Sequence, residues 1–307
     1  MKRRRMTRAA VSLMLTAVFC LCSLPVSIAE DVYVENEYNF VDQSMEVNGG
    51  IPDNATGVLD RIKRKGVLRV ATEPYFAPQV FIDPDKEGQA QYAGADMELA
   101  RLIAEKMGVE LEIVPMEFTQ VLPSLTEDQC DLAISGIVFT PGRASSYAMS
   151  KGYYFPDRAA STTFIIRQED GESIQALEDL KDKILIAQSN SLQEALAATY
   201  VYQYKEFRRV SSLQSVYEAL KQGKADAGVV DQITAQTYIR NNPDAGLMIA
   251  ENLKFVMEDY FLGDRVVAKK GELQLMYYVN GVINEVLDGK YLQWIEEAQK
   301  RAAELGL

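Results

Sequence analysis

The 307-residue chain contains no histidine, which excludes several of the commonest catalytic and metal sites. A Ser-His-Asp or Cys-His arrangement needs an imidazole as general base, and most zinc sites need histidine or a cluster of cysteines. Proton transfer would depend on carboxylates, lysine or tyrosine alone. The missing histidine therefore excludes histidine-based catalytic and zinc sites. Our prediction for the whole chain is a protein without a metal, a cofactor or an enzymatic activity.

Cysteine is almost as rare, with three residues in the chain. Cys20 and Cys22 lie in an apolar segment near the N-terminus, and only Cys130 lies in the rest of the sequence. A single thiol cannot form an intramolecular disulfide, even in an oxidising compartment. The chain does not need one, because about 280 residues can bury a large core. We expect Cys130 to be a buried, inert thiol.

The N-terminal segment has the pattern of an export signal. Five basic residues precede or enter an apolar run at residues 11–21, and Ser27-Ile28-Ala29 offers the small residues that signal peptidase prefers. The run is shorter than the ~20 apolar residues that a membrane span needs. We predict that residues 1–29 are a cleaved signal peptide; an uncleaved anchor and a lipoprotein signal are the alternatives. The mature protein would be periplasmic, on the cell surface or extracellular.

Positive charge is scarce in the predicted mature chain. Residues 1–29 hold five basic and no acidic residues, so their removal takes the net charge from −12 to −17. Such a surface repels nucleic acids and anionic membranes and favours solubility. We therefore expect no nucleic-acid partner.

Residues 30–57 are acidic and polar, without a sustained period, and we predict a poorly ordered leader or linker there. Strand-like and helix-like segments alternate afterwards. Asp96 is a good N-cap for a helix that ends at Gly108, between strands at 67–71 and 110–114. This order is typical of parallel strands with right-handed crossovers.

The alternation restarts after residue 160. Further strands are expected at residues 162–167, 184–187, 207–210, 227–230 and 266–268. Ser211 and Gln214 form a capping box for a helix that ends at Gly223. Two amphipathic helices, at residues 273–287 and 291–305, complete the chain.

Two segments of the chain share a layout. Leu125–Ser135 and Leu220–Val230 each contain a helix end, a polar turn, an aspartate (Asp131 or Asp226) and a small apolar strand. Two similar α/β units facing each other would place the C-terminal ends of their strands across a cleft, where open α/β sheets bind ligands.

Seven motifs in a fixed order carry a resemblance to a known family. They are Ala71-Thr-Glu-Pro-Tyr-Phe-Ala-Pro78, Gly94-Ala-Asp-Met-Glu-Leu-Ala100, Phe118-Thr-Gln-Val-Leu-Pro-Ser-Leu125, Ser135-Gly-Ile-Val-Phe-Thr-Pro-Gly-Arg143, Leu177-Glu-Asp-Leu-Lys-Asp-Lys183, Gln188-Ser-Asn-Ser191 and Ala225-Asp-Ala-Gly-Val-Val-Asp231. Together they resemble the family 3 extracellular solute-binding proteins, the polar amino-acid receptors of ABC importers. The resemblance covers roughly residues 58–305.

The resemblance implies a type II periplasmic-binding fold. This is an α/β fold of two lobes, each with a mainly parallel sheet flanked by helices, joined by two hinge strands that let the lobes close like a Venus flytrap. Lobe 1 would comprise residues 58–160 and 261–307, and lobe 2 residues 161–260. The crossings would lie near Ala160–Phe164 and Phe255–Tyr260.

The resemblance also implies a function. The chain would capture an amino acid between its lobes and deliver it, as a monomer, to the membrane permease of an ABC importer. The alternatives are a cyclohexadienyl-type dehydratase on the same scaffold and a ligand-binding partner of a chemoreceptor.

Two charged residues would hold the ligand backbone. Arg143 would bind the carboxylate, because a guanidinium offers a bidentate fork that matches it. Asp231 would receive the ammonium, and its alternative role is N-cap of the next helix. Further polar contacts would come from Ser135 and Gly136.

Several positions depart from the family pattern. Val138 stands where many relatives carry a hydroxyl, so that only its amide could serve. Asn190 and Ser191 replace the usual Gly-Thr-Thr, and their amides at a helix N-terminus would suit an anion. Gln79 replaces the Phe of a common Pro-Phe pair.

The remaining candidates would surround the ligand side chain. Phe76 and Phe118 occupy the positions of the aromatics that sandwich it. Glu73 and Asp96 match acidic positions that line the pocket in binders of basic amino acids. An anion in a cleft carries a desolvation cost that a cationic ligand offsets. We therefore predict a basic amino acid as the ligand.

Overall fold

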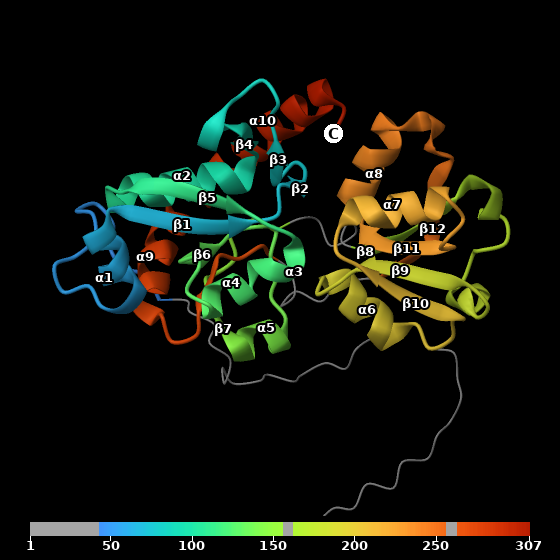
Figure 1. The fold of residues 1–307 in the computed structure, drawn as a ribbon, viewed down its shortest axis with the longest axis horizontal. Coiled ribbons are helices and arrows are strands. Elements are labelled where there is room, and N and C mark those ends of the chain that lie inside the picture. The colour runs from blue at the N-terminus through green and yellow to red at the C-terminus, as the bar shows by residue number, and fades with distance from the viewer. Residues whose placement is uncertain (1–42, 156–161, 256–262) are drawn as a thin grey trace, which may run out of the picture. The chain divides into compact units, whose positions relative to one another are not determined.

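The computed structural model describes residues 43–155, 162–255 and 263–307 (Figure 1). Within them, helices flank two five-stranded sheets, and a small three-stranded sheet adjoins the first. The mixed α/β class predicted from the sequence is therefore confirmed. None of the described helices is long and apolar enough to cross a membrane.

Some of the predictions fall on other parts of the chain. The predicted signal peptide and residues 30–42 of the predicted leader lie outside the described residues. The same holds for residues 160–161 of the first predicted hinge crossing and 256–260 of the second. The described part of the first crossing begins β8 (Thr162–Arg167), and Phe255 of the second ends β12 (Leu247–Phe255).

The first sheet has the strand order β5-β1-β6-β13-β7. Its strands are β1 (Val67–Thr72), β5 (Glu110–Pro115), β6 (Leu132–Ala133), β7 (Tyr147–Met149) and β13 (Val267–Lys269). Four of them run in the same direction, and β13 runs antiparallel between β6 and β7. A segment near the C-terminus thus completes a sheet that the N-terminal half begins.

Helices cover both faces of the first sheet. One core contains side chains of α1 (Gly57–Lys65), α2 (Ala95–Met107), α9 (Leu273–Asn284) and α10 (Lys290–Leu305). The opposite core contains side chains of the short helices α3 (Phe118–Val121), α4 (Pro123–Thr126) and α5 (Pro141–Ser146). Leu68 and Val70 of β1 join the first core and Ala71 joins the second, as the two-residue period of a strand requires.

The three-stranded sheet follows β1 along the chain. It consists of β2 (Tyr75–Phe76), β3 (Val80–Ile82) and β4 (Tyr92–Ala93), with the short 3₁₀ helix η1 (Gly88–Gln91) before β4. Gly94 then caps α2 with φ 113°, a conformation that favours glycine. The prediction that Asp96 caps this helix is wrong, because the helix begins at Ala95 and the Asp96 side chain makes no cap.

The second sheet repeats the plan of the first, in the order β10-β9-β11-β8-β12. Its strands are β8 (Thr162–Arg167), β9 (Ile184–Gln188), β10 (Glu206–Val210), β11 (Ala227–Asp231) and β12 (Leu247–Phe255). Again three neighbouring strands are parallel and the fourth, β8, is antiparallel to both of its neighbours.

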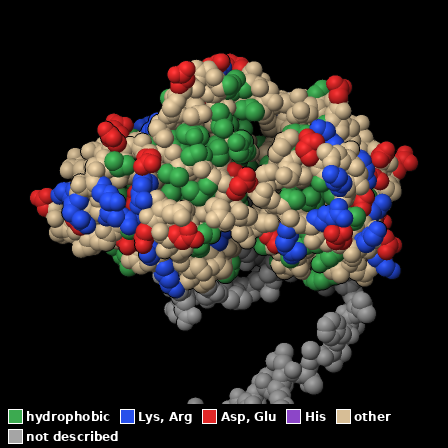
Figure 2. Space-filling view, viewed as in Figure 1, with side chains coloured by type: hydrophobic (Ala, Val, Ile, Leu, Met, Phe, Trp, Pro, Cys, Tyr) green, Lys and Arg blue, Asp and Glu red, His purple; other side chains and the backbone are tan. Residues whose placement is uncertain are grey.

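Helices also cover both faces of the second sheet. The longer ones are α6 (Leu192–Tyr200), α7 (Leu213–Lys221) and α8 (Gln232–Asn241), and the 3₁₀ turns are η3 (Gln168–Asp170), η4 (Leu177–Leu180) and η5 (Pro243–Ala245). Phe164 and Ile166 of β8 face the core on the α6 side, whereas Ile165 faces the core of α7 and α8. Side chains of both signs are interspersed on the face shown in Figure 2.

The repeated layout seen in the sequence corresponds to a repeated contact. Asp131 precedes β6, and its carboxylate accepts the backbone N–H of Arg69 at 2.8 Å. Asp226 precedes β11, and its carboxylate accepts the N–H of Ile184 at 2.7 Å. Each aspartate thus fastens the start of one parallel strand to the start of the next.

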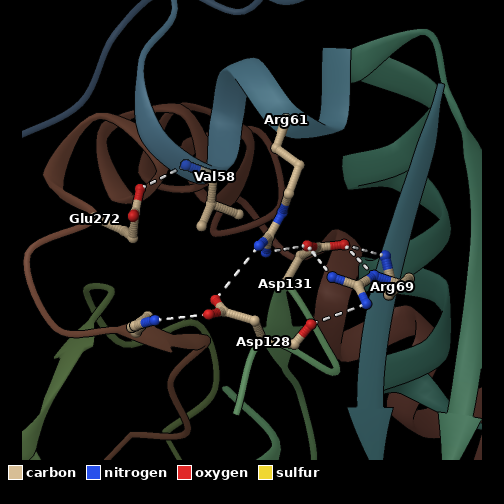
Figure 3. A network of polar contacts seen from close by, with 7 residues as sticks. Val58, Arg61, Arg69, Asp128, Asp131 and Glu272 are labelled. Carbon is tan, nitrogen blue, oxygen red and sulfur yellow. Dashed lines mark hydrogen bonds and ion pairs between the residues drawn. The ribbon is translucent and has the colours of Figure 1, made fainter. Parts of the chain in front are cut away.

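Arginines complete both contacts. Arg61 and Arg69 lie 2.7 and 2.9 Å from Oδ1 of Asp131, which is buried (Figure 3). Arg167 lies 3.0 Å from Oδ1 of Asp226 in the second sheet. A buried carboxylate needs such partners to offset its desolvation.

Residues 43–57 pack against α9, although the sequence predicted a poorly ordered segment there. Met45 donates its N–H to the carbonyl of Tyr277 at 3.0 Å, and Val47 is buried in the first core. Gly281 of α9 makes this approach possible, because a Cβ atom there would lie 2.2 Å from the carbonyl oxygen of Met45. The segment is therefore part of the folded structure.

Candidate functional site

A cavity lies where parallel strands of both sheets end. Glu73 follows β1, Ser135 follows β6, Gln188 ends β9 and Asp231 ends β11. The cavity is lined by Glu73, Phe76, Gln79, Phe118, Ser135, Gly136, Val138, Arg143, Gln188, Ser191, Leu192, Gln193, Asp231, Ile233, Gly263 and Asp264. The carboxyl ends of parallel strands are the usual ligand site of open α/β sheets.

Arg143 lies in α5, a short helix that starts with Pro141 and is capped by Thr140. Its side chain is buried, and its guanidinium donates at 2.9 Å to the carbonyl oxygens of Val138 and Asn190. The Phe118 ring lies 5.8 Å from the guanidinium carbon. Burial lowers the pKa of Arg143 to about 10, so the group remains cationic at neutral pH. Three of its five N–H donors are left for an anion.

Asp231 caps a helix and also lines the cavity. Its Oδ1 accepts both the N–H and the hydroxyl of Thr234 at 2.9 Å, which caps α8, and the residue also lines the cavity. Burial raises the pKa of Asp231 to about 6, against the opposing effect of the Thr234 bonds. The carboxylate is therefore mostly ionised at neutral pH.

Glu73 is buried at the cavity wall, with 3% of its surface exposed. Its backbone N–H donates to Oγ of Ser135 at 3.0 Å, and its Oε1 accepts the side-chain amide of Gln188 at 2.7 Å. Burial raises the pKa of Glu73 to about 7; the Gln188 bond lowers it and the charge of Glu117 raises it further. A cationic ligand group beside Glu73 would favour the ionised form.

Contacts with Phe76 and Asp96 fix the turn at Ser135 and Gly136. Gly136 has φ 55°, and a Cβ atom there would lie 2.6 Å from the Phe76 ring, so only glycine fits. Its N–H donates to Oδ2 of Asp96 at 2.7 Å. The Gly136 N–H therefore already has a partner. Ser135, which also lines the cavity, is left to offer a polar group to a ligand.

Nine of the eleven residues predicted for the site line the cavity, and two do not. Asp96 is buried behind it and accepts the hydroxyls of Tyr153 and Tyr291 at 2.8 and 2.7 Å. The backbone N–H of Asn190 donates to Oε2 of Glu194 at 2.6 Å, and its backbone carbonyl accepts from Arg143. Asp96 supports the turn at Gly136, and Asn190 holds the guanidinium.

Several lining residues were not predicted from the sequence, among them Gln188 and Asp264. Gln188 ends a parallel strand, and that position was a usable signal. Asp264 lies just before β13, far along the chain from the other acidic residues of the cavity. No local sequence pattern marks it as a site residue. In the described part of the chain, no three His, Cys, Asp or Glu side chains come together as a metal site.

Known proteins resemble this chain over much of its length. The arginine-binding extracellular protein ArtP of Bacillus subtilis is 32% identical over 163 residues, which is 52% of this chain and 60% of that protein. The cyclohexadienyl dehydratase of Pseudomonas aeruginosa is 29% identical over 188 residues, covering 61% and 67% of the two chains. The similar proteins are therefore mainly, though not solely, binding proteins.

Solved structures resemble this chain as well. The amino acid ABC transporter substrate-binding protein AbpA from Streptococcus pneumoniae, bound to L-arginine, has a TM-score of 0.70 and 33% identity and covers 79% of this chain and 98% of its own. This likeness confirms the predicted type II periplasmic-binding architecture. The sequence model of the bacterial extracellular solute-binding proteins, family 3, matches residues 68–297, and the chain belongs to that family.

Proposed function

We propose that the cavity captures a free amino acid for delivery to the permease of an ABC importer. The observation that carries this proposal is the presence of Arg143 and Asp231 in one cavity. A guanidinium and a carboxylate match the two charges of a zwitterion. Arg143 would bind the α-carboxylate and Asp231 the α-ammonium, while Phe76 and Phe118 would contact the side chain.

The ligand we propose is a basic amino acid, with arginine first. Glu73 supplies a third charge in the cavity, buried and bonded to a neutral amide. A guanidinium or ammonium would give this carboxylate the partner that it lacks. Of the similar proteins, ArtP is named for arginine and AbpA was solved with L-arginine.

Capture would proceed by closure of two lobes, at residues 58–160 with 261–307 and at 161–260. The bonds from Arg143 to Asn190 and from Gln188 to Glu73 join residues of the two sheets at the cavity. A ligand that contacts both sides would favour the closed state in the same way. We further propose that the mature protein is exported, acts as a monomer and docks on its permease in this closed form.

The test is calorimetry of the purified protein with the twenty amino acids, after removal of any ligand that co-purifies. We expect L-arginine, L-lysine or L-ornithine to bind most tightly. Product formation from prephenate or arogenate, without tight binding of any amino acid, would contradict the proposal.

Two substitutions test whether Arg143 and Glu73 bind the ligand. Arg143→Ala should leave the protein folded and lower the affinity by about 2–5 kcal/mol, because it leaves the ligand carboxylate buried without a partner. Glu73→Gln should weaken the binding of basic amino acids and spare neutral ones. The exposed Arg240→Ala is the control; equal affinities for Arg143→Ala and this control would remove Arg143 from the site.

A further inference from the structure

Asp264 is a buried acid that the proposed function leaves unexplained. It lines the cavity and is 4% exposed. Within the described residues its carboxylate takes part in no hydrogen bond or ion pair, and its Oδ2 is fully enclosed. A buried carboxylate without a donor is costly, so natural proteins seldom keep one without a reason.

The backbone of Asp264 is firmly placed. Its N–H donates to the carbonyl of Tyr154 at 2.8 Å, and its carbonyl accepts the N–H of Tyr153 at 2.9 Å. It also forms an antiparallel bridge with Val138, whose side chain lines the same cavity. Asp264 therefore borders the cavity from a strand-like segment that is fixed on both sides.

Asp264 lies at the end of the cavity that holds Arg143, by its charged neighbours and by its backbone pairing. Burial raises the pKa of Asp264 well above its usual range, and the charges of Asp96 and Asp231 raise it further, while Arg265 and Arg143 oppose this. The backbone pairing agrees with this, because Asp264 bridges to Val138, whose carbonyl accepts from Arg143 at 2.9 Å. Asp264 therefore lies at the end of the cavity that holds Arg143.

The Asp231–Arg143 end offers few free acceptors for a ligand ammonium. An ammonium offers three N–H donors. Oδ1 of Asp231 is already occupied by two bonds from Thr234, and the carbonyl of Val138 accepts from Arg143. A second carboxylate at this end would supply the missing acceptors.

We propose that Asp264 is a second acceptor for the α-ammonium of the bound amino acid, beside Asp231. This inference rests on the proposed function and names a further ligand-contacting residue in the same site. It predicts that Asp264 selects for a free α-amino group, whatever the side chain of the ligand. It also explains why a strand-like segment holds an acid without a protein partner at this point.

The experiment compares Asp264→Asn with the parent protein by calorimetry, using three probes. L-arginine has both cationic groups, L-citrulline keeps the α-ammonium but has a neutral side chain, and 5-guanidinopentanoic acid keeps the guanidinium but lacks the α-amino group. We expect the variant to lose at least tenfold in affinity for L-arginine and L-citrulline, and less than twofold for 5-guanidinopentanoic acid. The exposed Asp244→Asn, which removes the same charge, should change none of the three.

A loss for L-arginine and 5-guanidinopentanoic acid with L-citrulline spared would place Asp264 at the ligand side chain and overturn the proposal. Affinities within twofold of the parent for all probes would also overturn it, while the proposed function would stand. A parent protein that binds no amino acid would remove both. The thermal midpoint of ligand-free Asp264→Asn should equal or exceed that of the parent, which shows that any lost affinity does not come from misfolding.

Discussion

Asp231 caps α8 and, in the proposed function, also binds the ligand ammonium; a substitution can separate these two roles. An asparagine keeps an oxygen for the N–H of Thr234 but loses the charge. We expect Asp231→Asn to retain most of the stability and to lose at least tenfold in affinity for amino acids. Asp231→Ala should lose the same affinity and also about 1 kcal/mol of stability, because it removes the helix cap.

Calorimetry and urea unfolding of the two variants provide the check. If Asp231→Asn binds amino acids as tightly as the parent, the residue is only a cap, and the ammonium must be held by other groups. Equal stability of the two variants would instead show that the cap contributes nothing measurable.

Much of the cavity lining could be predicted residue by residue, since nine of the eleven residues predicted for the site line the cavity. Asp96 shows the limit of such predictions. Its motif placed an acid near the cleft, but the partners of that acid are Tyr153 and Tyr291, far away in sequence. The direction of a side chain depends on contacts that no local pattern contains. Asp264 was missed for the same reason.

At the scale of elements, the strand–helix alternation and the repeated layout were predictable, because they arise from local periodicity. Single boundaries were less so. The sequence predicted Ser211 as the cap of α7, but Ser212 accepts the N–H of Ser215 at 3.2 Å. Adjacent serines offer the same chemistry, so the sequence alone could not choose between them.

Asp131 and Asp226, which each join two neighbouring parallel strands, should contribute differently to the stability of the protein. Asp131 is fully enclosed and holds two arginines, whereas the Asp226 side chain is 23% exposed and pairs with Arg167. We expect Asp131→Ala to destabilise the protein by about 3 kcal/mol or more, because it leaves charges uncompensated near the core. Asp226→Ala should cost about half of that.

Thermal and urea unfolding of both variants test this expectation. Neither residue lines the cavity, so amino-acid affinity of the folded variants should match the parent. A larger loss for Asp226→Ala than for Asp131→Ala would contradict the assignment based on burial.

The contact of residues 43–57 with α9 depends on Gly281, because this residue has no side chain. We expect Gly281→Ala to destabilise the protein by about 1–3 kcal/mol, because the new methyl group would collide with the backbone at Met45. Gly49→Ala is a matched control in the same segment, since nothing lies within 4 Å of the position that its Cβ would take. Equal thermal midpoints for the two variants would show that this segment does not stabilise the folded protein.

At the scale of the whole molecule, stability should depend on pH through Glu73. Its pKa is raised from 4.5 to about 7 in the folded protein, so folding favours its protonated form. The resulting stabilisation is complete below about pH 4.5 and is lost as the pH rises through 7. Glutamine mimics the protonated side chain at every pH.

We therefore expect ligand-free Glu73→Gln to match the parent near pH 4.5 and to exceed it by up to about 3 kcal/mol at pH 8. Urea unfolding at both pH values measures this difference. A saturating basic ligand should reverse the order at pH 8, because it stabilises the ionised parent. A difference that does not change with pH would mean that Glu73 titrates normally.

The position of β13 in the first sheet affects the order in which the two halves of the chain can fold. This strand, at residues 267–269, pairs with both β6 and β7 inside the first sheet. The strands of the second sheet all lie between residues 162 and 255, so that this sheet is contiguous in sequence. During synthesis from the N-terminus, the half that emerges first must therefore wait for nearly the last residues before it can close. We therefore expect the half that emerges second to be able to complete its sheet before the half that emerges first.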